Sequence, residues 1–181
     1  MKAHLSAFQD AGRILFEKGL VTGSSGNLSI RLDDHLIITT HGSTLQALSV
    51  SDLVKTPLSG EACAGASWEL PVHRAIYSEN PALAVAHAHP PFAVALSLQK
   101  RGKHLTAKVA VLDAGEGIVP GAIAEEMARE LQKSPIVMVK GHGTFATGKT
   151  LAEACRITLA YEAECMLTCS EHHIVPSSGV E

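Results

Sequence analysis

Apolar residues recur at helical spacing in several stretches of this 181-residue chain. In residues 6–20, Phe8, Ala11 and Leu15 fall on one side of a helix, and Gly19 is typical of a helix end. The other predicted helices cover residues 68–80, 90–102, 120–134 and 151–167. The pattern therefore predicts helices in both halves of the chain, separated by shorter apolar runs.

Polar and proline signals mark where three of these helices begin. Ser67 is expected to cap the helix that follows it, and Pro71 lies close enough to its start to be tolerated. The two prolines at residues 90–91 suit the first turn of the next helix. Thr150 and Glu153 have the spacing of a capping box for the last helix.

Strand-like runs fill the intervals between the helices. Predicted strands cover residues 28–32, 35–40, 53–58, 81–89 and 135–141, with one or two more in 103–117. Residues 141–148 contain three glycines and are predicted to form a loop. Because the early strands follow one another directly, we expect an α/β fold with a mixed, largely antiparallel central sheet flanked by helices.

Length and composition favour one globular domain. We expect residues 1–181 to form a single domain, of which residues 172–181 are a mobile tail. The net charge of −3 and the aromatic content of 4% do not support nucleic-acid binding. Apolar runs are too short to cross a membrane, and the N-terminus lacks the apolar core of a secretory signal.

The cysteines follow neither a disulfide framework nor a C-x-x-C pattern. Three of them lie in the last helix-like segment; the set is Cys63, Cys155, Cys165 and Cys169. A domain of this size with a good core has little need of disulfides, so we expect reduced structural thiols. Reduced thiols and the missing secretory signal predict a cytoplasmic protein.

Histidine is the unusual residue type, with ten copies. His87 and His89 lie two residues apart at the end of a predicted strand, and strand periodicity directs both side chains to one face. Two imidazoles so placed could bind one divalent metal ion. The alternative is an ordinary pair of surface or core histidines, which this spacing alone does not exclude.

Three further residues are candidates for the same site. His142 lies between two glycines, straight after a predicted buried strand, but a loop histidine without a partner would look the same. Glu69 lies near the start of a predicted helix, where the helix dipole also favours an acid. His73, one turn later, could pack in the core or support a ligand. Spacing alone therefore leaves the metal site open.

Four segments carry a resemblance to a known family, and together they span most of the chain. They read GSSGNLSIR, LIITTHG, SWELPVHRAIYSENPALAVAHAHP and VKGHGTFATG. Within them lie E-x3-H-x3-Y, an H-x-H pair eighteen residues past the glutamate, and a later G-H-G. On these motifs the chain resembles the class II aldolase/adducin family, and within it the fuculose-phosphate aldolase branch.

The resemblance implies a three-layer fold, a divalent metal and a closed assembly. The metal, most often Zn2+ with Mn2+, Co2+, Ni2+ or Fe2+ as alternatives, would be held by His87, His89 and His142. Glu69 would serve as the catalytic acid/base and could touch the metal when no substrate is present. A ring-like homotetramer would place the sites between subunits.

The resemblance also implies a pocket for the phosphate group of a substrate. Gly26, Asn27, Gly42 and Ser67 fall on positions of this pocket. There, backbone N–H groups and the amide of Asn27 could hold an anion. A glycine-rich loop alone is more often only a turn, so this expectation depends on the resemblance.

Some positions depart from the aldolase pattern. His41 and Trp68 stand where small hydroxyl residues are usual, and Trp68 is expected to narrow the pocket. The two tyrosines, Tyr77 and Tyr161, do not match those that aldolases of the family place near the cleaved bond. Lys108 lies near one of the expected tyrosine positions.

The activity implied by the resemblance is reversible retro-aldol cleavage of a small, fuculose-phosphate-like ketose phosphate. The products would be dihydroxyacetone phosphate and an aldehyde, formed through a metal-stabilised enediolate with Glu69 moving the proton. The departures leave a second interpretation, a metal-dependent decarboxylase or dehydratase of a sugar-acid phosphate or sugar phosphate. A third is a non-catalytic interaction domain like the adducin head, against which the three histidines and the glutamate argue.

Overall fold

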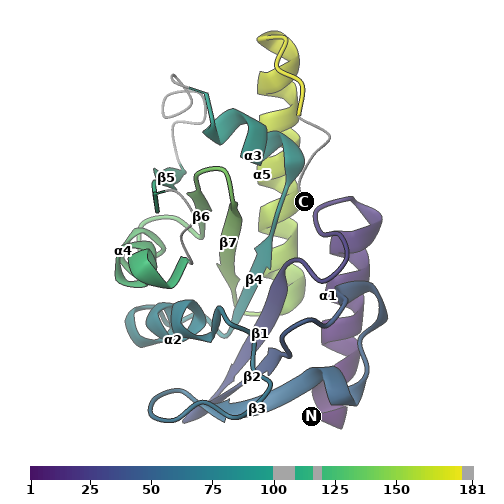
Figure 1. Cartoon of the computed structure of the whole chain (residues 1–181), viewed down its shortest axis with the longest axis vertical. Helices are drawn as coiled ribbons and strands as arrows, with labels where there is room; N and C mark the ends of the chain where they lie inside the picture. The colour runs from purple at the N-terminus through teal and green to yellow at the C-terminus, as the bar shows by residue number, and fades with distance from the viewer. Residues whose placement is uncertain (100–108, 116–119, 177–181) are drawn as a thin grey trace.

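The computed structural model describes residues 1–99, 109–115 and 120–176 (Figure 1). The strands in these residues are β1 (Asn27–Leu32), β2 (His35–Thr39), β3 (Leu53–Pro57), β4 (Ala84–Ala88), β5 (Ala110–Leu112), β6 (Ile136–Val139) and β7 (Gly143–Gly148). The α-helices are α1 (Leu5–Glu17), α2 (Leu70–Glu79), α3 (Pro91–Ser97), α4 (Ala124–Glu130) and α5 (Leu151–Glu171). Short 3-10 helices cover Lys2–His4, Leu45–Ala47, Val50–Asp52 and Pro120–Ile123.

The strands form one mixed sheet in the order β3-β2-β1-β4-β7-β6-β5. Every neighbouring pair is antiparallel except β5 and β6, which run parallel. The β1–β2 hairpin turns at Asp33, whose φ of 38° is the left-handed conformation that Asp tolerates in turns. The sheet confirms the prediction of a mixed, largely antiparallel α/β fold.

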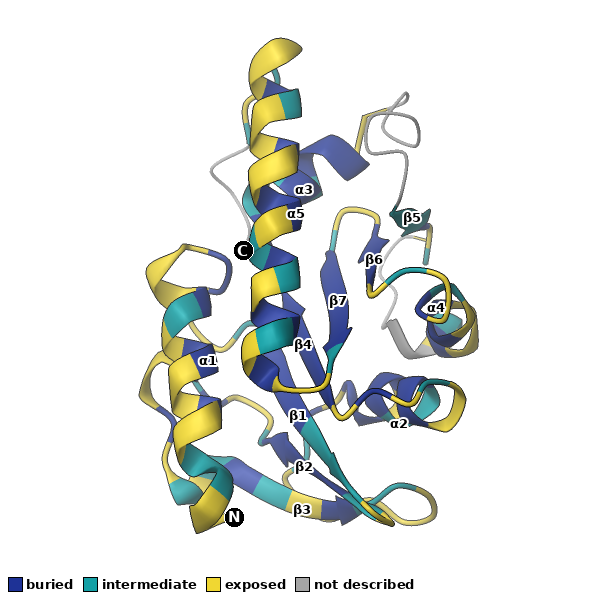
Figure 2. Cartoon of the chain, turned by 180° about the vertical axis from the view of Figure 1, so that it is seen from behind, coloured by how far each residue is buried: buried dark blue, intermediate teal, exposed yellow. Residues whose placement is uncertain are grey.

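Helices cover both faces of the sheet, so the fold has three layers (Figures 1 and 2). The face toward α2 and α4 carries larger side chains such as Val85 and Phe145. The face toward α1, α3 and α5 carries Ala84, Ala86 and Ala88 of β4. Because strand side chains alternate between faces, β4 is buried on both sides, and its alanines leave room for α5 against the sheet.

The first and last helices begin and end much as predicted. α1 ends at Glu17, and Gly19 adopts a φ of 70°, which suits glycine after a helix. At the start of α5, the Thr150 hydroxyl accepts the N–H of Glu153 at 3.1 Å. The Glu153 carboxylate accepts the N–H of Lys149 at 2.7 Å, so the reciprocal half of the capping box lies one residue earlier than predicted.

The predicted start of α2 is wrong by two residues. α2 begins at Leu70, and Glu69 is its N-cap residue. The N–H of Leu70 donates to the carbonyl of Ser67 at 3.0 Å, which makes residues 67–70 a turn that precedes the helix. Ser67 Oγ accepts the N–H of Glu69 at 3.3 Å within that turn, and Pro71 lies in the first helical turn as predicted.

The loop predicted for residues 141–148 is also wrong, because most of it is strand β7. β7 pairs with β4 on one side and with β6 on the other. Its glycines lie at the ends of the strand, and Thr144, Phe145 and Thr147 between them are strand-forming types. Pairing on both sides therefore decides the conformation against the local glycine signal.

Several other predicted elements are present but shorter than predicted, and α3 ends at Ser97, before the predicted end at residue 102. β4 covers Ala84–Ala88, which is shorter than the predicted 81–89, and β5 is the described part of the strand expected in 103–117. Residues 172–176 follow α5 as a turn, whereas Lys108 and residues 177–181 lie outside the described residues, so the mobile tail stays a prediction. Among the described helices, none has the length and apolarity needed to span a membrane.

Candidate functional site

His87 and His89 come from the end of β4, at the centre of the sheet. His87 lies in the strand and pairs with Asn27 of β1 and Phe145 of β7, so these three side chains form a row on one face. The His87 ring stacks on Phe145 with 4.1 Å between ring centroids. His87 Nδ1 lies 2.9 Å from the carbonyl oxygen of Thr144, to which a protonated Nδ1 donates. His89 directly follows the strand.

His142 reaches the same place from the turn between β6 and β7. Its N–H donates to the carbonyl of Val139 at 3.0 Å, and Gly141 before it has a φ of 70°. Gly143 after it is needed for a different reason: a Cβ there would collide with the carbonyl oxygen of Ala88 and with the His89 ring. The glycines beside His142 therefore form the turn and bring β7 close to β4.

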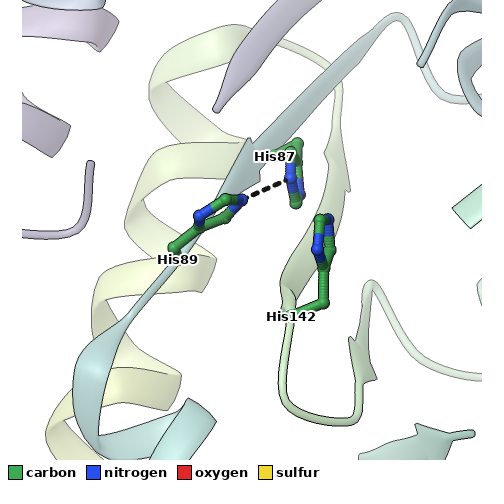
Figure 3. A group of neighbouring side chains, drawn as sticks. All are labelled: His87, His89 and His142. Carbon is green, nitrogen blue, oxygen red and sulfur yellow. Dashed lines mark hydrogen bonds between the residues drawn. The ribbon is translucent and has the colours of Figure 1, made fainter. Parts of the chain in front are cut away.

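The three histidines named from the sequence meet in space (Figure 3). One nitrogen of each ring lies within 4.8 Å of the corresponding nitrogens of the other two. His87 Nε2 and His89 Nε2 are 2.9 Å apart, and the rings of His87 and His142 stack at 5.0 Å. Burial lowers the pKa of His87 to about 4 and that of His89 to about 3, so both rings are neutral at neutral pH.

Glu69 faces this cluster from the start of α2. Its Oε1 lies 3.2 Å from His142 Nε2, and its Oε2 lies 3.3 Å from His87 Nε2. Burial raises the pKa of the Glu69 carboxyl, but the imidazoles of His87 and His142 and the amide of Asn27 outweigh it and hold that pKa well below its usual range. Glu69 is therefore an ionised carboxylate at neutral pH.

These residues suit a divalent cation on chemical grounds. With the Nδ1 proton of His87 donated to Thr144, its Nε2 carries only a lone pair. The same nitrogen lies 2.9 Å from His89 Nε2 and 3.3 Å from an ionised Glu69 oxygen, which is also only an acceptor. A cation between them satisfies both groups, and neutral imidazoles are the form in which histidine binds metals.

A hydrogen-bonded group lies directly behind Glu69. The amide of Asn27 donates to Glu69 Oε2 at 2.5 Å and its oxygen lies 2.6 Å from His73 Nε2. His73 is fully buried on α2, and its Nδ1 lies 2.6 Å from Ser29 Oγ. Of the two interpretations left open for His73, a packed residue or a support for the site, the structure favours the support.

The predicted phosphate-binding residues line the same hollow as the histidines and Glu69. Gly26, Asn27, Gly42 and Ser67 surround a space of about 190 Å³. Gly26 has a φ of 75°, and a Cβ there would collide with Val21 and with the carbonyl oxygen of His87. The Asn27 amide, expected to face an anion, is directed to Glu69 instead. Larger hollows of about 830 and 530 Å³ contain none of the predicted residues.

His41 and Trp68, the two departures from the aldolase pattern, lie in contact at the edge of this hollow. Their rings stack with 3.8 Å between centroids and 13° between planes. Trp68 lines the hollow but is 72% exposed, so it lies against His41 at the rim. Their contact was not foreseen, because the residues are 27 positions apart in the sequence.

Comparison with known proteins places this geometry in a family. The model of the class II aldolase and adducin N-terminal domain matches residues 6–169. The solved structure of L-fuculose-1-phosphate aldolase from Thermus thermophilus superposes with a TM-score of 0.85 and 31% identity, covering 96% of each chain. The shared fold thus extends over almost the whole molecule.

Related sequences carry three kinds of activity in their names. The 5-methylthioribulose-1-phosphate/5-deoxyribulose-1-phosphate aldolase of Rhodospirillum rubrum is 31% identical over 95% of this chain and 85% of its own length. The 3-oxo-tetronate 4-phosphate decarboxylase of Haemophilus influenzae is 31% identical over 79% of this chain and 76% of its own.

A longer relative joins two activities. The probable bifunctional methylthioribose-1-phosphate isomerase/methylthioribulose-1-phosphate dehydratase of Nocardia farcinica is 30% identical over 93% of this chain, which spans 36% of that relative. Aldolases, decarboxylases and dehydratases are all carbon lyases, and the family uses a divalent metal. Because the family model covers nearly the entire sequence and the fold agrees, this chain belongs to the class II aldolase and adducin N-terminal domain family.

Proposed function

We propose that this chain is a metal-dependent lyase that cleaves a small ketose phosphate by a retro-aldol reaction, giving dihydroxyacetone phosphate and an aldehyde. The observation that carries the proposal is the cluster of three imidazoles opposed by an ionised Glu69. The similarity to an aldolase sequence and to an aldolase structure supports the same reaction.

His87, His89 and His142 would hold the metal, most simply Zn2+, with three nitrogen ligands. When bound, the metal supplies Lewis-acid stabilisation of negative charge on substrate oxygens. Imidazole ligands bring no negative charge, so the positive charge of the metal stays available, and Phe145 stacks on the His87 ring. Burial of His87 holds this ligand in a single orientation.

Glu69 would move the proton. In the cleavage direction it accepts the proton of the hydroxyl group whose carbon becomes the aldehyde. The carbon–carbon bond breaks, and its electron pair stays with the carbonyl half as an enediolate. Glu69 then returns the proton to the enediolate carbon that lost the bond. Glu69 is ionised at neutral pH, which is the form that can accept a proton.

The rest of the hollow would bind the phosphate group. Gly26, Gly42 and Ser67 line it, together with Asn27, whose amide also donates to Glu69. We further propose a homotetramer with sites completed between subunits. Light scattering should then give about four chains per particle, and dilution to monomers should abolish activity.

A decarboxylase or dehydratase of a sugar-acid phosphate or sugar phosphate is the second candidate. The stacked His41 and Trp68 favour it, because they replace two small hydroxyl residues at the rim of the hollow. The related decarboxylase and dehydratase sequences point the same way. If the chain is a diverged aldolase, Trp68→Ser should improve its use of ordinary ketose phosphates.

Product analysis separates the two candidates. The metal-loaded protein is incubated with dihydroxyacetone phosphate and short aldehydes, with a 3-oxo acid phosphate, and with a methylthioribulose-type phosphate. Retro-aldol chemistry is shown by a new ketose phosphate in the first mixture. Release of carbon dioxide or loss of water from the other two, without aldol products, would move the assignment to the second candidate.

A further inference from the structure

A chain of hydrogen bonds connects the core beside α2 to Glu69. Tyr77 Oη lies 2.8 Å from Ser29 Oγ, which lies 2.6 Å from His73 Nδ1. His73 Nε2 lies 2.6 Å from Asn27 Oδ1, and Asn27 Nδ2 donates to Glu69 Oε2 at 2.5 Å. The chain of contacts therefore begins in the hydrophobic core and ends on the carboxylate of the candidate site.

The donor of each bond follows from the end at Glu69. The Asn27 amide donates from Nδ2 to Glu69 Oε2 and turns its oxygen to His73 Nε2. That oxygen only accepts, so His73 carries its proton on Nε2 and leaves Nδ1 bare. The Ser29 hydroxyl donates to Nδ1 and accepts from the Tyr77 hydroxyl.

Burial makes this arrangement costly to reverse. Ser29, His73 and Tyr77 are at most 1% exposed, and Asn27 is 7% exposed. A buried donor or acceptor left without a partner costs about 1–3 kcal/mol. Burial also lowers the pKa of His73 to about 4, so the ring is neutral at neutral pH, as the bond directions require.

The E-x3-H-x3-Y motif supplies this geometry through helix periodicity. Glu69, His73 and Tyr77 are four residues apart, so they lie above one another on the face of α2 that meets β1. Asn27 and Ser29 are two residues apart on β1 and share the face toward α2. One face of α2 and one face of β1 are thus joined by a series of side-chain hydrogen bonds.

We propose that His73 is a positioning residue for Glu69. It holds the Asn27 amide in the orientation that donates to Glu69 Oε2, with Ser29 and Tyr77 holding His73 in turn. This inference rests on the proposed acid/base function of Glu69. It also gives Asn27 a task beyond the phosphate pocket, because its amide aims the carboxylate between His87 and His142.

Two conservative variants at one position test the proposal. His73→Gln can place an amide N–H near the position of the imidazole Nε2 and still donate to Asn27. His73→Asn is shorter, reaches only toward Ser29, and leaves the Asn27 oxygen unpaired. We expect His73→Asn to lower kcat by about 10- to 100-fold and His73→Gln by less than about threefold, since small misplacements of a catalytic group have effects of this size.

Metal content should change little in both variants, because the hydrogen bonds of His73 go to Ser29 and Asn27 and to none of the three candidate ligand histidines. Denaturant unfolding measures how much stability each variant loses. If His73 has only a structural role, both variants should lose stability and their kcat values should not differ. Equal kcat values for the two variants, or a kcat loss that follows unfolding free energy alone, would overturn the proposal.

Nitrogen NMR of the metal-loaded wild-type protein provides a readout that needs no turnover. The expected tautomer of His73 has its proton on Nε2 and none on Nδ1; a proton on Nδ1 would overturn the proposal. His73→Asn should also move the side-chain amide resonance of Asn27, and His73→Gln should leave it nearly in place. If no lyase substrate is found, the proposed function fails, while these resonances still decide the positioning of Asn27 by His73.

Discussion

Glu69 and Glu162 are both buried glutamates, but their neighbours give them opposite properties. Glu69 faces the imidazoles of His87 and His142 and the amide of Asn27 in the hollow of the candidate site. Glu162 lies on α5, where its two oxygens accept the N–H groups of Phe92 and Ala93 at the start of α3, at 2.8 and 2.9 Å.

The pKa values of the two carboxyls move in opposite directions. For Glu162, burial raises the pKa, and the two backbone N–H groups only partly offset it. For Glu69, burial also raises the pKa, but nearby imidazoles and an amide reverse the outcome. Burial alone therefore does not identify a reactive carboxylate; what matters is whether polar side chains around a hollow hold it in the ionised form.

The largest effect should come from removing one candidate ligand. His89→Ala should lose most of the bound metal, about one divalent ion per chain in the wild type, and the activity with it. The fold should survive, because His89 lies beyond the end of β4 and is only half-buried. Metal analysis and thermal unfolding measure the two effects.

Glu162→Gln serves as the matched control and should keep its metal. A metal-free wild type purified after growth in zinc without chelator would contradict the assignment of the histidine cluster. It would also remove the reason for assigning a catalytic role to Glu69 and not to Glu162.

The next largest effect should come from Glu69→Gln. The variant keeps the shape and the bond to Asn27 but cannot accept a proton, so kcat should fall by about two to four orders of magnitude. Metal content and unfolding free energy should stay close to those of the wild type. Steady-state kinetics with the substrate identified by product analysis measures the loss, and near-normal turnover would mean that another group moves the proton.

Glu162→Gln should affect stability and leave the chemistry unchanged. Replacing one carboxylate oxygen by an amide group leaves a buried N–H of α3 without its acceptor, which should cost about 1–3 kcal/mol of unfolding free energy. Denaturant titration measures this cost. A loss of kcat at unchanged stability would show that the two glutamates do not divide their tasks as their surroundings indicate.

A smaller effect should appear in the pH dependence of the metal-free protein. The pKa of His73 is lowered from 6.5 to about 4 by burial, so the unfolded chain binds a proton that the folded chain does not. Stability should therefore fall as pH drops from about 6.5 toward about 4.

His73→Gln removes this group, so the slope of unfolding free energy in that range should decrease by up to about 1.4 kcal/mol per pH unit. Denaturant titrations at several pH values measure the slope. An unchanged slope would mean that His73 is already protonated in the folded protein. The neutral His73 required by the hydrogen bonds behind Glu69 would then be wrong.

Local patterns predicted much of the fold. Helical spacing located α1 and α5. Strand periodicity predicted that the side chains of His87 and His89 lie together, as Figure 3 shows. β7 was missed because glycine content is a local signal, whereas β7 is held by strands on both sides. The start of α2 was misplaced because Ser67 is a good cap in isolation, yet it lies in a preceding turn.

The candidate site was predicted less completely. The resemblance named the histidines and Glu69, but no pattern indicated that the Asn27 amide turns to Glu69 or that His41 stacks on Trp68. Gly143 was one of the three glycines from which a loop was predicted. A side chain at position 143 is excluded because the His89 ring and the Ala88 carbonyl approach too closely. The residues adjacent to Gly143 in the sequence do not reveal this contact.

The sequence by itself determined the elements and the shared face of nearby residues, such as Glu69, His73 and Tyr77 on α2, because these depend on spacing of a few residues. Only the tertiary structure decided which distant groups meet: Asn27 and Glu69 are 42 residues apart, and His142 and Glu69 are 73 apart. Sheet pairing and helix packing bring these groups within hydrogen-bonding distance, and the low pKa of Glu69 exists only once they are assembled.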